Sequence, residues 1–253
     1  MLISQLSKAF TAASLLLILS LKAGSTQDLD YGSAYTEVSV GEAGDATAVH
    51  KMVLNRHIAA YVKTYIKKND ELLRDVRKKS ESPFKVMDNV FTSYNLPVEL
   101  KYLAVIESEL NPRAVSPVGA VGTWQLMPAT AEILGLKVSR KNDERTHLRK
   151  STVAAAKYLR DLYNEFGDWL LVMAAYNGGP GPVYAAIKKS GSRNFYNLQY
   201  FLPAESREHV KKYIATHYYF EGRPGITTLT KIETYHYAKA MAQMAKSNEL
   251  TKL

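Results

Sequence analysis

The hydrophobic positions of this chain recur with a helical period over most of its length. Between residues 51 and 81, apolar side chains return every three or four positions, as at Ile58, Val62 and Ile66, and many of the intervening residues are Lys or Arg. This pattern predicts an amphipathic helix with a basic face. A solvated face on a docking helix and a dedicated polyanion site are both compatible with that charge.

From residue 82 onward, short apolar-periodic segments are separated by helix-starting and helix-ending residues. Pro97 suits a first helical turn and Gly167 is placed to end a later helix. No run alternates with period two for long enough to predict a strand. We therefore predict an all-α fold: a helical domain over residues 82–222, with the extra N-terminal amphipathic helix before it and a helical extension over 223–253.

The first 50 residues follow different patterns. Residues 1–25 carry Lys8, then an apolar run and small residues, which is typical of a secretory signal peptide. The run is shorter than the roughly 20 residues of a transmembrane helix; an uncleaved anchor or a buried helix is the alternative. Residues 26–50 are rich in Gly, Ser and Thr, acidic and without Lys or Arg, so we predict a flexible acidic tether and an exported mature protein.

Charge and cysteine content narrow the possible partners. The chain holds 33 Lys and Arg against 24 Asp and Glu, a formal net charge of +9, which favours an anionic partner such as nucleic acid, a membrane surface or an acidic cell-wall polymer. No nucleic-acid-binding pattern is present, and an export signal argues against that partner. The chain has no cysteine, which excludes disulfides, thiol nucleophiles and thiol-linked lipid anchors. The histidines include no H-E-x-x-H pair, so we predict neither a metal site nor a cofactor.

One carboxylate falls within an apolar stripe. In the segment after Pro97, Glu107 shares a helical face with Leu103 and Leu110. An ionised carboxylate in an apolar setting raises its pKa, finds hydrogen-bond donors, or takes part in chemistry. Position alone leaves two interpretations open, a catalytic acid and a glutamate paired with a buried Arg or Lys.

Two loops carry polar and aromatic residues that suit a carbohydrate or a base. Residues 116–128 form a glycine-punctuated segment with Trp124 and Gln125, and Tyr176 and Asn177 precede a second glycine-rich turn. Glycine permits close backbone approach, and Gln offers both a donor and an acceptor. Trp124 fits a stacking platform and a core position equally well.

Three segments in this order resemble the soluble lytic transglycosylase (SLT) domain: ELKYLAVIESELNPRAVSPVGAVGTWQLMPATA, AAYNGGPGPV and LPAESREHVKKYIATHYY. The resemblance covers residues 82–222 and is strongest to the membrane-bound lytic murein transglycosylase D type. It implies a helical domain related to goose-type lysozyme. The chain departs from the family pattern at Gly178, where Ala is usual, and at Ser206, where Thr is usual.

The resemblance also implies a site and a reaction. Glu107 would be the single catalytic acid and base of a peptidoglycan lytic transglycosylase, which cleaves the β-1,4 bond between N-acetylmuramic acid and N-acetylglucosamine and leaves 1,6-anhydromuramyl ends. It would act in the periplasm or cell envelope of a bacterium, on peptidoglycan glycan strands. The substrate-binding positions carried over are Ser108, Ser116, Gln125, Met127, Tyr176, Asn177, Glu205 and Tyr213.

Two other functions stay open at this point. A lysozyme-like muramidase would hydrolyse the same bond with a second carboxylate positioning water; the candidates are Glu109, Asp143, Glu144 and Glu205. A non-catalytic glycan-binding envelope protein is the other alternative, although it would have no use for a costly acid at Glu107. No LysM-like wall-binding repeat and no lipid-bearing Cys is found, so the expected routes of attachment are wall contact through the basic face of 51–81 and membrane association without a lipid anchor.

Overall fold

The computed structural model describes residues 35–42 and 45–239, with side chains from residue 55 onward. Residues 35–230 form one compact unit. Residues 231–239 are helical and fall outside that unit. The predicted signal peptide (1–25) lies outside the described residues, as does the end of the predicted C-terminal extension. Among the helices that are described, none is long and apolar enough to cross a membrane.

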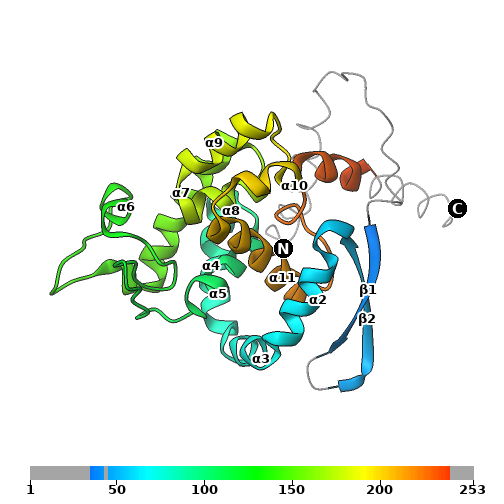
Figure 1. The fold of residues 1–253 in the computed structure, drawn as a ribbon. Coiled ribbons are helices and arrows are strands. Elements are labelled where there is room, and N and C mark those ends of the chain that lie inside the picture. Colours follow the sequence, from blue (N-terminus) through cyan, green and yellow to red (C-terminus); the bar gives the residue numbers. More distant parts are fainter. Residues whose placement is uncertain (1–34, 43–44, 240–253) are drawn as a thin grey trace, which may run out of the picture. The chain divides into compact units, whose positions relative to one another are not determined.

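The unit begins with a two-stranded antiparallel sheet, which was not expected from the sequence. β1 (Tyr35–Glu42) pairs with β2 (Asp45–Asn55), and the hairpin lies beside α2 (Figure 1). The prediction of a flexible tether over 26–50 is therefore wrong for the part that forms strands. Thr36, Val38 and Val40 are β-branched residues at alternate positions, which is typical of a strand. The prediction of a tether relied instead on the Gly- and Ser-rich composition of the segment.

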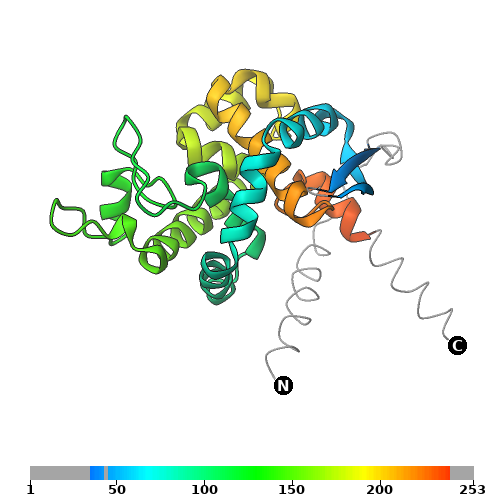
Figure 2. The same cartoon turned by 90° about the horizontal axis from the view of Figure 1, so that it is seen from below.

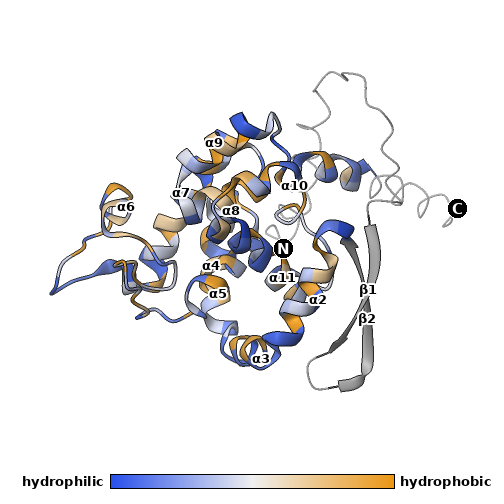
Figure 3. Cartoon of the chain, in the orientation of Figure 1, coloured by the Kyte–Doolittle hydropathy of each residue, from blue (hydrophilic) through white to orange (hydrophobic). Residues whose placement is uncertain are grey.

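The predicted amphipathic helix over 51–81 is two helices. α2 (Arg56–Lys68) begins where the Asn55 side chain accepts a hydrogen bond from the backbone amide of His57, and α3 (Asp70–Lys79) follows after Asn69. The predicted stripe of α2 is buried against α11 (Ala204–Glu221). Figure 3 shows the alternation of hydrophobic and hydrophilic residues along both helices, as the pattern predicted.

A buried helix forms the centre of the domain. Every residue of α8 (Trp169–Gly178) from Trp169 to Ala175 is buried, and α7 (Leu148–Phe166), α9 (Pro180–Ser190) and α11 pack around it. Asp168 caps α8 by accepting a hydrogen bond from the amide of Leu170 at 2.9 Å. The helical, lysozyme-like fold class is confirmed, with the hairpin as an addition.

The remaining elements surround this core. α4 (Glu81–Ser93) leads through the 3₁₀ turn η1 (Val98–Lys101) into the short α5 (Tyr102–Ser108). A long irregular segment then carries α6 (Pro128–Ile133) and η2 (Glu144–Thr146) and extends from the helices in both views (Figures 1 and 2). Between α9 and α11 lie α10 (Phe195–Leu198) and η3 (Gln199–Phe201). The end of α5, the long segment and α11 together position the candidate site.

Candidate active site

The site is built around Glu107, in the last turn of α5. Leu103, on the same helical face, is fully buried, whereas the Glu107 side chain retains 14% exposure. The helix ends one residue later, because Glu109 and Leu110 both adopt left-handed backbone conformations with φ of 54° and 64°. Such conformations cost free energy in non-glycine residues and cluster at functional sites. The predicted apolar stripe therefore carries the carboxylate to the rim of the core.

The partner of Glu107 is a histidine. Nε2 of His209, on α11, lies 2.8 Å from Oε1 of Glu107. The His209 side chain is 9% exposed, and within the described residues its Nδ1 has no hydrogen-bond partner. The alternative of a buried Arg or Lys partner is thus not what the structure shows. His209 was missed from the sequence; the available signal was its place on the same face of the last helix as Tyr213.

Two hydrogen bonds hold the glycine-punctuated segment beside Glu107. The Ser108 hydroxyl donates to the carbonyl oxygen of Thr123 at 2.9 Å, and the Tyr176 hydroxyl donates to that of Trp124 at 2.7 Å. Burial, and next the negative charge of Glu107, raise the pKa of Tyr176 well above its usual value. Ser108 and Tyr176 therefore position backbone around the carboxylate, with Tyr176 close enough to sense its charge.

Trp124 belongs to the core. Its side chain is fully buried, and its indole Nε1–H donates to Oγ1 of Thr152 at 3.0 Å. Its ring meets that of Phe91 edge-on, with centroids 5.6 Å apart. Of the two alternatives for this residue, the structure supports core packing and not a stacking platform.

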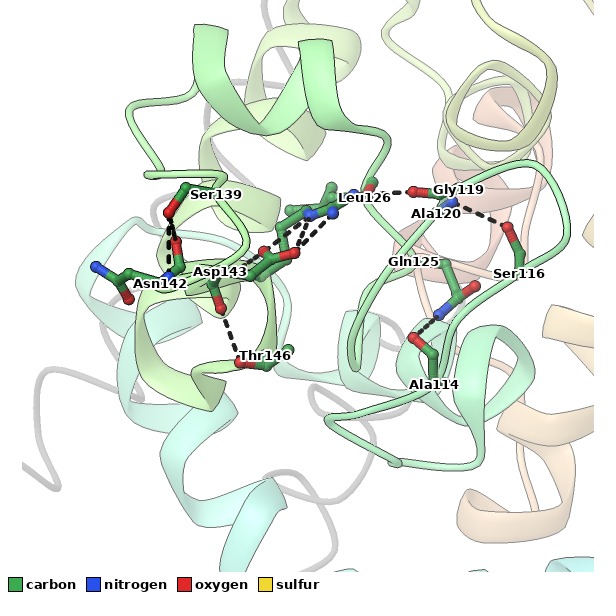
Figure 4. A network of polar contacts seen from close by, with 11 residues as sticks. Ala114, Ser116, Gly119, Ala120, Gln125, Leu126, Ser139, Asn142, Asp143 and Thr146 are labelled. Carbon is green, nitrogen blue, oxygen red and sulfur yellow. Dashed lines mark hydrogen bonds and ion pairs between the residues drawn. The ribbon is translucent and has the colours of Figure 1, made fainter.

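The same segment carries Gln125 and Ser116. Gln125 has a φ of 44°, and its Nε2 donates to the carbonyl oxygens of Gly122 and Ala114, at 2.9 and 3.2 Å. The Ser116 hydroxyl accepts a hydrogen bond from the backbone amide of Ala120 at 2.9 Å, which closes the turn between these two residues (Figure 4). Both side chains thus shape the segment from within. Met127, at its end, is 42% exposed.

A buried arginine, Arg145, which was not among the residues expected from the sequence, holds this segment. Nη1 of Arg145 donates to the carbonyl oxygens of Gly119 and Leu126 at 2.9 and 3.0 Å, while its Nε and Nη2 bind Asp143. Figure 4 shows Asp143 opposite the segment that contains Gly119 and Leu126. Gly122 is required here, because a Cβ would collide with the carbonyl oxygen of Arg145. The Arg145 hydrogen bond lowers the pKa of the Asp143 carboxyl group.

A second pair of residues joins α8 to α11. The buried Ser206 hydroxyl donates to Oδ1 of Asn177 at 2.9 Å. A Cβ at Gly178 would collide with that same hydroxyl. Glycine in place of the usual alanine therefore leaves room for the hydrogen bond that orients Asn177.

Not every predicted residue reaches the site. Tyr213 is fully buried, and its hydroxyl donates to the carbonyl oxygen of Glu99 at 3.2 Å. Tyr213 thus ties α11 to η1 in this structure, and substrate contact by Tyr213 stays a prediction. Glu205 is exposed in the first turn of α11. Within the described residues, no group of three His, Asp or Glu side chains could hold a metal ion.

The carboxylates proposed for water activation differ in their surroundings. Asp143 is bound by Arg145, and Glu144 forms an ion pair with Lys150 at 2.6 Å. The Glu144 carboxylate also accepts from the backbone amide of Lys137 at 2.9 Å, and these hydrogen bonds lower its pKa. Both carboxylates therefore stabilise the loops. The other two candidates are exposed.

These features define a helical, lysozyme-like domain in which one partly buried carboxylate lies between a glycine-punctuated segment and the last long helix. Residues 91–199 match the family model of the transglycosylase SLT domain. The resemblance inferred from the three sequence motifs is thereby confirmed.

Individual relatives agree with that match. The membrane-bound lytic murein transglycosylase D of Escherichia coli (strain K12) is 37% identical over 153 residues, 58% of this chain and 33% of that protein. The soluble lytic murein transglycosylase of Salmonella typhimurium (strain LT2) is 29% identical over 53% of this chain and 22% of that protein. The chain thus spans a third or less of these relatives' length.

Solved structures show the same fold. The 70 kDa soluble lytic transglycosylase of Escherichia coli superposes with a TM-score of 0.51 and 27% identity, over 59% of this chain and 26% of that one. A complex of the 70 kDa soluble lytic transglycosylase with bulgecin A gives a TM-score of 0.53 at 24% identity, over 67% of this chain and 31% of that one. The likeness thus covers more than half of this chain.

Proposed function

We propose that this protein is a peptidoglycan lytic transglycosylase, with Glu107 as the single acid and base. One observation carries the proposal: Glu107 lies at the rim of an apolar core, and only its Oε1 is hydrogen-bonded within the described residues. The other carboxyl oxygen remains available to a ligand. The confirmed SLT match and the murein transglycosylases among the relatives support the same substrate class.

The reaction needs one group that gives a proton and takes one back. Glu107, as a carboxylic acid, protonates the oxygen that links N-acetylmuramic acid to N-acetylglucosamine, and the bond from that oxygen to the muramyl anomeric carbon breaks. The resulting carboxylate then accepts the proton of the muramyl 6-hydroxyl as its oxygen bonds to the anomeric carbon. The products are a free 4-hydroxyl and a 1,6-anhydromuramyl end, no water is consumed, and Glu107 is protonated again.

The loop ion pairs favour this route over hydrolysis. Most glycosidases place a second carboxylate about 5–9.5 Å from the acid, to act as nucleophile or to activate water. Asp143 and Glu144 are bound to Arg145 and Lys150, and these pairings hold the loop structure. A substrate hydroxyl that acts as the nucleophile removes the need for a second carboxylate.

The natural substrate is then the glycan strand of peptidoglycan, and we propose the periplasm or cell envelope of a bacterium as the location. Relatives named as membrane-bound and soluble murein transglycosylases support an envelope location. No metal or organic cofactor enters the proposed steps, because the proton transfers and the attack use only Glu107 and substrate oxygens.

Mass spectrometry of digested peptidoglycan tests the proposal. We expect muropeptides with anhydro ends from the wild type, and a fall in rate of about 10²–10⁴-fold for Glu107→Gln, which keeps the shape but cannot donate and recover the proton. Glu109→Gln is the matched control and should stay near wild-type rate. Reducing ends together with loss of activity in Glu109→Gln would establish hydrolysis instead, and the absence of any product would leave only a glycan-binding role.

A further inference from the structure

We infer that His209 is a positioning residue that fixes which oxygen of Glu107 carries the catalytic proton. The inference rests on the proposed function and adds the role of a residue from a distant helix. His209 and Glu107 come from α11 and α5, and their side chains meet at 2.8 Å with little exposure on either side. Within the described residues, no other hydrogen bond reaches the Glu107 carboxyl group.

The unpartnered Nδ1 of His209 decides its tautomer. If Nε2 carries the hydrogen, the buried Nδ1 presents only a lone pair, and the Nε2–H donates to Oε1 of Glu107. If Nδ1 carries it, a buried N–H is left without an acceptor, which is costly and rare. A doubly protonated ring leaves the same N–H unpaired and adds a buried charge. The geometry therefore selects a neutral ring that donates through Nε2.

This tautomer assigns separate tasks to the two oxygens of Glu107. Oε1 accepts the hydrogen bond from His209, so the acidic proton resides on Oε2, the oxygen without a partner among the described residues. After that proton passes to the glycosidic oxygen, the hydrogen bond from Nε2–H of His209 to Oε1 remains and now stabilises the Glu107 carboxylate. Hydrogen bonds to charged groups are the stronger ones, so His209 favours the state that follows proton transfer.

The neighbouring donors cannot replace His209. Ser108 and Tyr176 donate to the carbonyl oxygens of Thr123 and Trp124. On α11, Lys211 pairs with Glu208 at 3.3 Å. Removal of the imidazole donor therefore leaves the Glu107 carboxyl group free to rotate, with its proton on either oxygen.

Two substitutions separate positioning from packing. His209→Phe keeps a ring but removes the donor, and we expect kcat on soluble glycan chains to fall about ten- to hundredfold with KM nearly unchanged, the factor for one hydrogen bond to a charged group. His209→Gln places an amide N–H where Nε2–H stood, and it should recover most of the lost kcat. A residue that only fills space would give the opposite order, since Phe preserves the ring and Gln does not.

Nitrogen-15 NMR of the wild-type ring reads the tautomer without reference to turnover. We expect Nε2 protonated and Nδ1 unprotonated at neutral pH. A ring protonated on Nδ1, or an unchanged kcat in a folded His209→Phe, would overturn the inference even if the wild type yields anhydro products. A wild type that yields none refutes the proposed function, while the NMR result still tests the Glu107–His209 geometry.

Discussion

A second histidine of α11, His217, should make the domain sensitive to mild acid. Its side chain is 1% exposed among Tyr102, Tyr213 and Tyr218, and neither ring nitrogen has a partner within the described residues. Burial, and next the charge of Arg223, lower its pKa from 6.5 to about 3. His217 is therefore protonated near pH 6.5 in the unfolded chain but only near pH 3 in the folded chain. The free energy of unfolding thus falls as pH falls through this window.

The size of the effect follows from the two pKa values. Between pH 7 and pH 5 the unfolded state gains proton-binding free energy and the folded state gains almost none, a difference of about 2 kcal/mol. His217→Phe removes the titrating group and the unpaired nitrogens while it keeps an aromatic ring in an aromatic pocket. We therefore expect the variant to lose about 2 kcal/mol less stability than the wild type over this pH range.

Urea unfolding followed by circular dichroism at pH 7, 6 and 5 measures this difference. Carboxylates contribute equally to both proteins, so the comparison isolates His217. The exposed His147, changed to Phe, is the matched control and should keep the wild-type pH dependence. If His217→Phe loses as much free energy of unfolding between pH 7 and pH 5 as the wild type, the burial argument is refuted.

Two further predictions concern the site and the basic surface. Gly178→Ala should displace the Ser206 hydroxyl, break its hydrogen bond to Asn177 and lower kcat/KM about tenfold on soluble glycans; a wild-type value would show that Asn177 is not held this way. Replacement of the exposed Lys63, Lys67 and Lys78 by Glu should weaken co-pelleting of the protein with peptidoglycan sacculi more than it slows turnover of short glycans. This effect should appear only at low salt, since exposed charges are screened beyond about 8–10 Å at physiological salt. Equal pelleting of variant and wild type at low salt would show that the basic face of α2 and α3 is only solvated.

Helical periodicity gave most of the fold because each helix carries its own signal. The stripe of α2 and the capping of α8 by Asp168 are both visible in the local sequence. The break between α2 and α3 at Asn69 is not visible there, because the hydrophobic period continues across it. The hairpin was hidden for a related reason, since strand formation depends on a partner strand as much as on local composition. Local patterns therefore located the elements better than their ends.

Only part of the candidate site could be predicted from the sequence. Glu107 could be, because a carboxylate on an apolar helical stripe is unusual and is visible within its own helix. Arg145 could not be, because it acts by donating to the carbonyl oxygens of Gly119 and Leu126, whose positions depend on loop conformation. The resemblance placed Tyr213 among the substrate-binding residues, whereas its side chain is fully buried, because a motif does not say which face of α11 packs against the core. Motifs thus identified residue positions, and tertiary packing decided their roles.

The two buried histidines of α11 show how tertiary packing decides the role of a residue. His209 and His217 stand eight positions apart, about two helical turns, and so lie on one face of the helix. Opposite them runs α5, with Glu107 at its end beside His209 and Tyr102 at its start against His217. The same side chain is therefore a hydrogen-bond donor to a carboxylate at one end of the helix pair and an unpaired base among aromatic rings at the other. Its role follows from which α5 residue it meets, a fact that lies about a hundred positions away in the chain and in no local pattern of α11.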